Sequence, residues 1–150
     1  MFAGILPSVR SYVMYILGIK SGGHESTACL IKDGVLVAAV EEERFNRIKH
    51  AKGFPHQAMQ WCLTQAGITL ADVDIVTSPM NPWKGVFNMA LHFVRYFPRN
   101  LGVLKERADA VGYFSYFREE EMVYKSAGMS RARCHFKFLP VEHHMAHAAS

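Results

Sequence analysis

Two histidines near the end of the sequence have the spacing of a metal-binding pair. His143 and His147 stand four positions apart in the segment 141–150, VEHHMAHAAS. If this segment is helical, both imidazoles project from one face about one turn apart and can hold the same metal ion. Position 144 carries histidine instead of the glutamate of the metalloprotease motif HExxH, so that chemistry is not expected. Two imidazoles leave coordination positions open, and we expect a further ligand, a carboxylate, from sequence beyond Ser150.

Histidines at this spacing also occur by chance on the surfaces of helices. Two features favour metal binding over that explanation. The apolar run 135–141 predicts a strand that delivers His143 to the end of a sheet, where open α/β sheets place ligands. Small residues such as Ala146 allow the helix to pack closely. For His144 we expect a surface position, or a contact with a metal ligand, rather than ligation.

A further candidate is His24, which closes the turn Ser21-Gly22-Gly23-His24. Glycines leave backbone amides accessible and let a ligand approach closely, so Gly22 is a candidate for contact with a ligand. An unperturbed imidazole titrates near about pH 6.5 and can take a proton from an attacking hydroxyl. A histidine in a glycine turn is also commonly an ordinary loop residue, and the spacing leaves both explanations open.

A charged cluster, EEERFNRIKH, occupies residues 41–50. It fits a solvated strand end in which acids and bases compensate one another. It also fits a phosphate contact through Arg47 or Lys49, because the cluster leaves a strand of the same predicted sheet as His24. Composition leaves both explanations open.

The first elements that must position these residues are strands. Apolar runs at 13–19, 27–31 and 35–40 predict three consecutive antiparallel strands. Asp33-Gly34, between the second and third runs, predicts a tight hairpin.

Helices and further strands follow in alternation. Pro55 and Gly67 bound a predicted helix that runs to about Ala66, and a strand is expected at 73–77. Together with the strand at 135–141 and the histidine helix, this order predicts an α/β domain with a mixed sheet that starts with a three-strand antiparallel meander.

The remaining stretches give the expected domain organisation. Residues 1–13 are expected to be an extension or a misplaced start, and 14–150 the N-terminal portion of a domain. Residues of about 82–127 predict a helical, aromatic-rich insertion over the core. Within it an apolar stripe at helical spacing is more typical of core packing than of a partner surface; its residues are Trp83, Phe87, Leu91 and Val94.

Composition excludes several other classes of protein. The 150 residues are 50% hydrophobic and 20% charged, enough to build a core, and the net charge of +4 is scattered, so no nucleic-acid partner is expected. Three separated cysteines without a CxxC pair fit packing residues in a reducing cytoplasm. No apolar run of about 18 residues is present, so we expect no membrane span.

Five separated motifs now carry a resemblance. The glycine-turn histidine, the hairpin, EEERF with its following Arg and Lys, the GFP before the first long helix, and HHxAHAAS occur in the order of NodU/CmcH O-carbamoyltransferases. The chain resembles the N-terminal region of that family from about Tyr15 to Ser150, apart from the aromatic insertion. The resemblance implies a ribonuclease-H/actin-like ATPase (ASKHA) fold, incomplete in these residues, in the variant shared with the tRNA threonylcarbamoyl-adenosine transferase.

The resemblance also implies a reaction. A C-terminal YrdC-like domain makes carbamoyl adenylate from carbamoyl phosphate and ATP, and the N-terminal domain transfers the carbamoyl group to a hydroxyl of a small molecule, often a sugar. His143 and His147 would bind the metal, Fe²⁺ or another divalent ion. His24 would be the general base, Lys49 would contact the nucleotide or its carbamoyl adduct, and Gly22 would contact the acceptor.

Other functions stay open at this stage. A relative acting on tRNA or on a hydrogenase-maturation protein is one, although the EEERF cluster and HHxAH fit the small-molecule branch better. A stand-alone metal-binding or interaction module without catalysis is the other. The family's downstream aspartate ligand, the second half of the domain and the YrdC-like domain are not among these residues. We therefore expect the 150 residues alone to be inactive and to bind metal weakly.

Overall fold

The computed structural model describes residues 12–22, 25–97, 99 and 116–148. In chain order the elements are β1 (Tyr15–Lys20), β2 (Thr27–Lys32), β3 (Val35–Glu41), α1 (Glu43–Asn46), α2 (His56–Gln65), η1 (Leu70–Asp72), β4 (Ile75–Ser78), α3 (Pro82–Tyr96), η2 (Tyr116–Arg118), α6 (Glu119–Ser126), η3 (Arg131–Arg133), β5 (Lys137–Pro140) and α7 (His143–Ala148). The extension predicted at 1–13 lies almost entirely outside the described residues.

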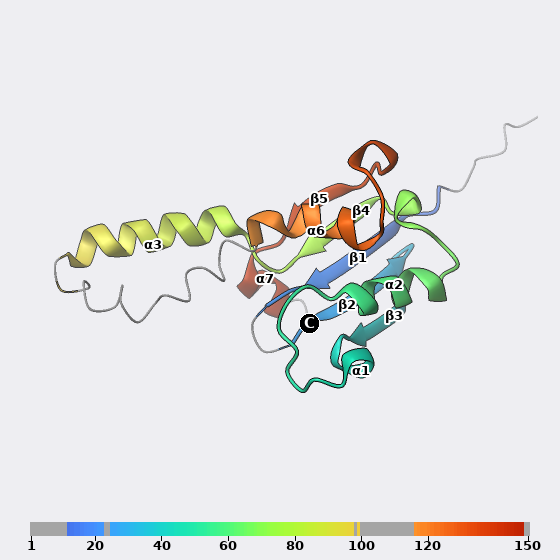
Figure 1. Ribbon diagram of the computed structural model, residues 1–150. Helices are drawn as coiled ribbons and strands as arrows, with labels where there is room; N and C mark the ends of the chain where they lie inside the picture. Colours follow the sequence, from blue (N-terminus) through green and yellow to red (C-terminus); the bar gives the residue numbers. More distant parts are fainter. Residues whose placement is uncertain (1–11, 23–24, 98, 100–115, 149–150) are drawn as a thin grey trace, which may run out of the picture.

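The strands form one five-stranded sheet in the order β3-β2-β1-β4-β5 (Figure 1). β1, β2 and β3 pair antiparallel, whereas β4 runs parallel to β1 and β5 runs parallel to β4. The predicted α/β class, the mixed sheet and the three-strand meander are therefore confirmed. The actin-like ATPase fold remains a prediction.

The hairpin between β2 and β3 forms where the sequence predicts it. Asp33 and Gly34 both have positive φ, 50° and 81°, which matches the right-handed twist of the two strands. The Asp33 carboxylate also accepts a hydrogen bond from the Met14 amide at 2.9 Å, and the Asp33 amide donates to the Met14 carbonyl at 3.0 Å. The turn is thereby fastened to the chain just before β1.

The hydrophobic core lies on the face of the sheet covered by α2 and α6. Leu17, Leu30 and Val76 supply it from three neighbouring strands, and all are fully buried together with Met59 of α2 and Val123 of α6. Complete burial of side chains of this size stabilises the fold by about 1.5–3 kcal/mol each. The two helices lie side by side in Figure 1.

The cysteines behave as packing residues, as predicted. Cys62 and Cys134 are buried, Cys29 is half-buried, and all three are free. Burial raises the pKa of the Cys62 thiol to about 11, with a smaller contribution from Cys29. A neutral, buried thiol acts as a small apolar side chain.

The predicted insertion divides into two unlike parts. α3 extends sideways from the sheet (Figure 1), and its stripe is exposed: Trp83 73%, Phe87 67%, Leu91 56% and Val94 75%. Core packing of the stripe is therefore wrong for the described part of the chain, because more than half of each of these four side chains is open to solvent. In contrast, α6 places Val123 and Tyr124 in the core of the sheet. Neither α3 nor any other helix in the described ranges is both long and apolar enough to cross a membrane.

The topology brings the segments that carry the candidate residues to one edge of the sheet. β1, β3, β4 and β5 all point the same way, so their carboxyl ends share that edge, and β2 begins there. In open α/β sheets this is the edge that binds ligands. The turn after β1, the charged cluster after β3 and α7 after β5 all start from it (Figure 1).

Candidate active site at the carboxyl edge of the sheet

The histidine motif lies on a helix, as predicted. α7 spans His143–Ala148, so positions 143 and 147 are about one helical turn apart. The amide of Val141 donates to the carbonyl of Ser78 at 2.7 Å, which fastens the entrance of α7 to the end of β4. The side chains of His143 and His147 lie outside the described part of the chain, as does His24. In the described part, no group of three His, Cys, Asp or Glu residues could hold a metal ion.

Glu142 caps α7, a role that sequence analysis missed. Its carboxylate accepts a hydrogen bond from the Met145 amide at 3.1 Å and one from Nδ1 of His144 at 3.0 Å. The bond from His144 and then that from Met145 lower the pKa of Glu142. An acidic residue directly before a helix is the signal that could have predicted this cap. The His144 side chain is 87% exposed, in agreement with a surface position.

A buried carboxyl lies where β1 and β4 end. Glu119, the first residue of α6, has no exposed surface, and the hydroxyl of Ser21 donates a hydrogen bond to its Oε1. The hydroxyl of Ser78 faces the same carboxyl but outside hydrogen-bond geometry, so Ser78 Oγ and Glu119 Oε2 have no partner among the described residues. Burial raises the pKa of Glu119, and the two hydroxyls oppose that shift.

We expect the raised pKa of Glu119 to appear as a pH dependence of stability. A carboxyl whose folded pKa exceeds its unfolded value stabilises the fold fully below the unfolded value, and this stability is lost as pH rises through the folded one. Glu119→Gln removes the titration. The free energy of unfolding of the wild type should therefore fall relative to that of Glu119→Gln between about pH 4.5 and neutral pH, measured by urea denaturation. If the free energies of unfolding of the two proteins change with pH in the same way, the pKa of Glu119 is not raised by folding.

Gly22 is required by the backbone at the start of the turn. Its φ is +69°, and its amide donates to the Gly53 carbonyl at 3.2 Å. A Cβ at this position would lie 2.9 Å from the hydroxyl of Tyr116. These contacts explain the glycine structurally, and contact with an acceptor stays a prediction.

The charged cluster after β3 serves two purposes. Glu42 is buried, and its carboxylate accepts hydrogen bonds from the amides of Gln57 and Ala58, at 3.1 and 2.8 Å, at the start of α2. Arg44 pairs with Glu41 at 3.7 Å on the surface. Lys49 is exposed, in the segment beyond α1 that follows the carboxyl end of β3. One acid of the cluster is therefore part of the fold, and Lys49 is accessible.

Glu42→Ala should destabilise the protein by about 1–3 kcal/mol, because the half-buried amide of Gln57 and the buried amide of Ala58 lose a charged acceptor. The matched control is Glu41→Ala, which removes only a solvent-exposed ion pair and should change the free energy of unfolding by less than about 1 kcal/mol. Chemical denaturation of both variants gives the comparison. Equal losses would mean that the cap contributes nothing beyond surface charge.

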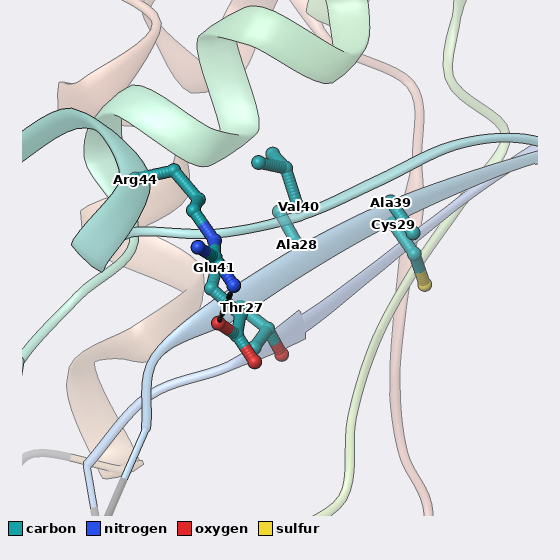
Figure 2. A pocket seen from close by; sticks show the side chains of 7 residues that line it. All are labelled: Thr27, Ala28, Cys29, Ala39, Val40, Glu41 and Arg44. Carbon is teal, nitrogen blue, oxygen red and sulfur yellow. Dashed lines mark ion pairs between the residues drawn. The ribbon is translucent and has the colours of Figure 1, made fainter. Parts of the chain in front are cut away.

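Two depressions lie near this edge. The first, of about 410 Å³, is lined by Thr27, Ala28, Cys29, Ala39, Val40, Glu41 and Arg44 (Figure 2). Its charged residues form the exposed Glu41–Arg44 pair drawn in Figure 2, and we assign it no ligand. The second, of about 660 Å³, lies between α3 and α7 and is lined by Trp83, Lys84, Phe87, Asn88, Glu142 and Met145. It places aromatic surface directly beside the histidine helix.

Comparison with known proteins shows the family to which the sequence belongs. Residues 15–150 match the family model described as the carbamoyltransferase N-terminus. The chain belongs to this carbamoyltransferase family. The resemblance to NodU/CmcH enzymes is thereby confirmed, and it includes every strand of the sheet and α7.

Two curated relatives of this region are much longer proteins. The chain is 38% identical over 143 residues to the uncharacterized protein sll1178 of Synechocystis sp., covering 91% of the chain and 22% of that protein. It is 49% identical over 53 residues to the nodulation protein NolNO of Sinorhizobium fredii, covering 35% of the chain and 8% of that protein. The chain thus spans about a fifth of the first relative's length. Among solved structures, YeaZ from Pseudomonas aeruginosa matches with a TM-score of 0.32 and 16% identity, over 45% of this chain and 31% of that one, too weak a likeness to assign the fold family.

Proposed function

We propose that this region is the N-terminal part of an O-carbamoyltransferase that transfers a carbamoyl group from carbamoyl adenylate to a hydroxyl of a small molecule. The observation that carries the proposal is the family match over residues 15–150. The sheet supports it, because the segments that carry His24, Lys49 and the His143–His147 pair all leave its carboxyl edge.

The metal fits α7 in part. The helix gives His143 and His147 the spacing that two ligands of one ion need. Glu142 is engaged in capping α7 and in its bond with His144, so a carboxylate ligand would come from elsewhere in the protein. When bound, Fe²⁺ or another divalent ion would act as a Lewis acid on the carbamoyl donor.

The remaining steps fall to the chain's own residues. His24 would take the proton from the acceptor hydroxyl as that oxygen attacks the carbamoyl carbon of carbamoyl adenylate, and AMP would be the leaving group. Lys49, exposed at the same edge, would neutralise phosphate charge of the nucleotide formed from ATP and carbamoyl phosphate. Gly22 would let the acceptor approach the backbone. The aromatic depression beside α7 offers room for an acceptor with an apolar ring face.

The direct test uses the full-length protein with carbamoyl phosphate, ATP and a panel of sugars and other alcohols. We expect carbamoyl adenylate without an acceptor, and a carbamoylated alcohol with the correct one, both detectable by mass spectrometry. Absence of both products across the panel would contradict the proposal. A product that forms only with tRNA or with a protein acceptor would instead assign the chain to another branch of carbamoyl chemistry.

A further inference from the structure

Residues 116–119, which include the start of α6, contact the turn after β1 at two points. Tyr116 places its hydroxyl against Gly22, close enough that a Cβ there would lie 2.9 Å away. Three residues later, Glu119 accepts a hydrogen bond from the hydroxyl of Ser21. Residues 116–119 therefore contact both residues that lead from β1 toward His24.

Glu119 differs from the other acids of α6. Glu120 pairs with Arg131 at 3.3 Å and Glu121 pairs with Lys125 at 2.6 Å, both in ordinary surface ion pairs. Glu119 alone turns into the protein, where its carboxyl is fully buried. Burying a carboxyl with a single hydrogen bond is costly, and an apolar side chain of the same size would avoid that cost. Core packing alone therefore does not account for a carboxyl at this position.

The position of Glu119 relative to the strands suggests what the carboxyl does. Ser21 directly follows β1 and Ser78 ends β4, the neighbouring parallel strand. The carboxyl thus lies between the ends of two strands at the edge where the candidate residues gather, with Glu119 Oε2 and Ser78 Oγ both unpaired among the described atoms. Its hydrogen bond with Ser21 ties the residue that follows β1 to the start of α6.

We propose that Glu119 is a positioning residue for carbamoyl transfer: its hydrogen bond holds Ser21 at the end of β1 and so sets the position of the turn that carries His24. The inference rests on the proposed function, because His24 is the general base only in that proposal. Glu119 itself lies outside the motifs that carry the family resemblance. A general base works only within hydrogen-bond reach of the proton it removes, so a displaced turn lowers the rate of transfer.

The test compares three variants of the full-length protein. Glu119→Met keeps the volume and removes the acceptor of the Ser21 hydrogen bond, and kcat for transfer should fall about 10- to 100-fold with little change in KM for carbamoyl phosphate. Glu119→Gln keeps an acceptor for Ser21 and offers a donor to Ser78, and it should restore kcat to within a few-fold of wild type. Val123→Ala, one turn further along α6, is the control for lost core packing and should leave kcat nearly unchanged.

A second measurement separates this inference from the proposed function. Amide hydrogen exchange of residues 20–26 should be faster in Glu119→Met than in Val123→Ala, whatever reaction the protein catalyses. Equal exchange in the two variants, or a Glu119→Met protein with wild-type kcat, would overturn the inference. A wild-type protein without carbamoyl transfer would overturn the proposed function, and with it the catalytic role of Glu119, even where the exchange result shows that the carboxyl holds the turn.

Discussion

His143→Ala in the full-length protein is expected to remove the bound metal and to lower carbamoyl transfer by at least about 100-fold. The reason is the position of residue 143 at the start of α7, one helical turn from His147. Losing one ligand of a pair leaves a single imidazole from this region, too few to retain the ion. Metal content by inductively coupled plasma mass spectrometry and kcat for the carbamoylated product are the two measurements.

His144→Ala is the matched control, because it removes an imidazole from the adjacent position of the same helix. The side chain of His144 is exposed and bonded to Glu142, so this variant should keep its metal and most of its activity. If both variants lose metal equally, the effect comes from the stability of α7 and not from ligation. If His143→Ala keeps a full equivalent of metal, the pair does not form the site.

Local chemistry explains why much of the fold could be predicted from the sequence. Asp33-Gly34 can adopt the positive φ angles that a tight hairpin needs, and few other pairs can. Asp72 accepts hydrogen bonds at 2.8 Å from both the amide and the hydroxyl of Thr69, three positions earlier, and these bonds cap η1. These features depend on residues a few positions apart, so their spacing in the sequence predicts them directly.

The buried carboxyl could not be predicted, because its partners are distant in the chain. Ser21 and Glu119 are separated by 98 positions, and the run Glu119–Glu121 has the pattern of a solvated helix start. Only the packing of α6 on the sheet turns one of the three acids inward. Ser78 was missed for the same reason, as a serine at the end of an apolar strand has no local signal of function.

The apolar stripe of α3 shows a second limit of prediction from the sequence. Apolar residues at helical spacing predict which side of a helix is apolar, but not what covers that side. In the described structure the four side chains of the stripe are exposed, and the ring of Trp83 meets that of Phe117 edge to face with 5.0 Å between the ring centroids. The pattern was correct for the helix and wrong for its environment.

The second large effect is expected at His24. His24→Ala in the full-length protein should lower kcat for transfer by about 10²- to 10⁴-fold, the usual contribution of a general base, while formation of carbamoyl adenylate continues at its wild-type rate. The two activities separate because the acceptor loses its proton only in the transfer step. Measuring the amounts of carbamoyl adenylate and of carbamoylated alcohol in the same reaction tests this directly.

The control for His24 is another histidine near the same edge. His50 is the last residue of the charged cluster, is exposed, and places its Nδ1 3.6 Å from a carboxylate oxygen of Glu25. His50→Ala should leave both steps within a few-fold of wild type, and added imidazole should restore part of the transfer lost in His24→Ala but not change His50→Ala. Loss of both steps in His24→Ala would instead mean that the turn after β1 supports the binding of the donor.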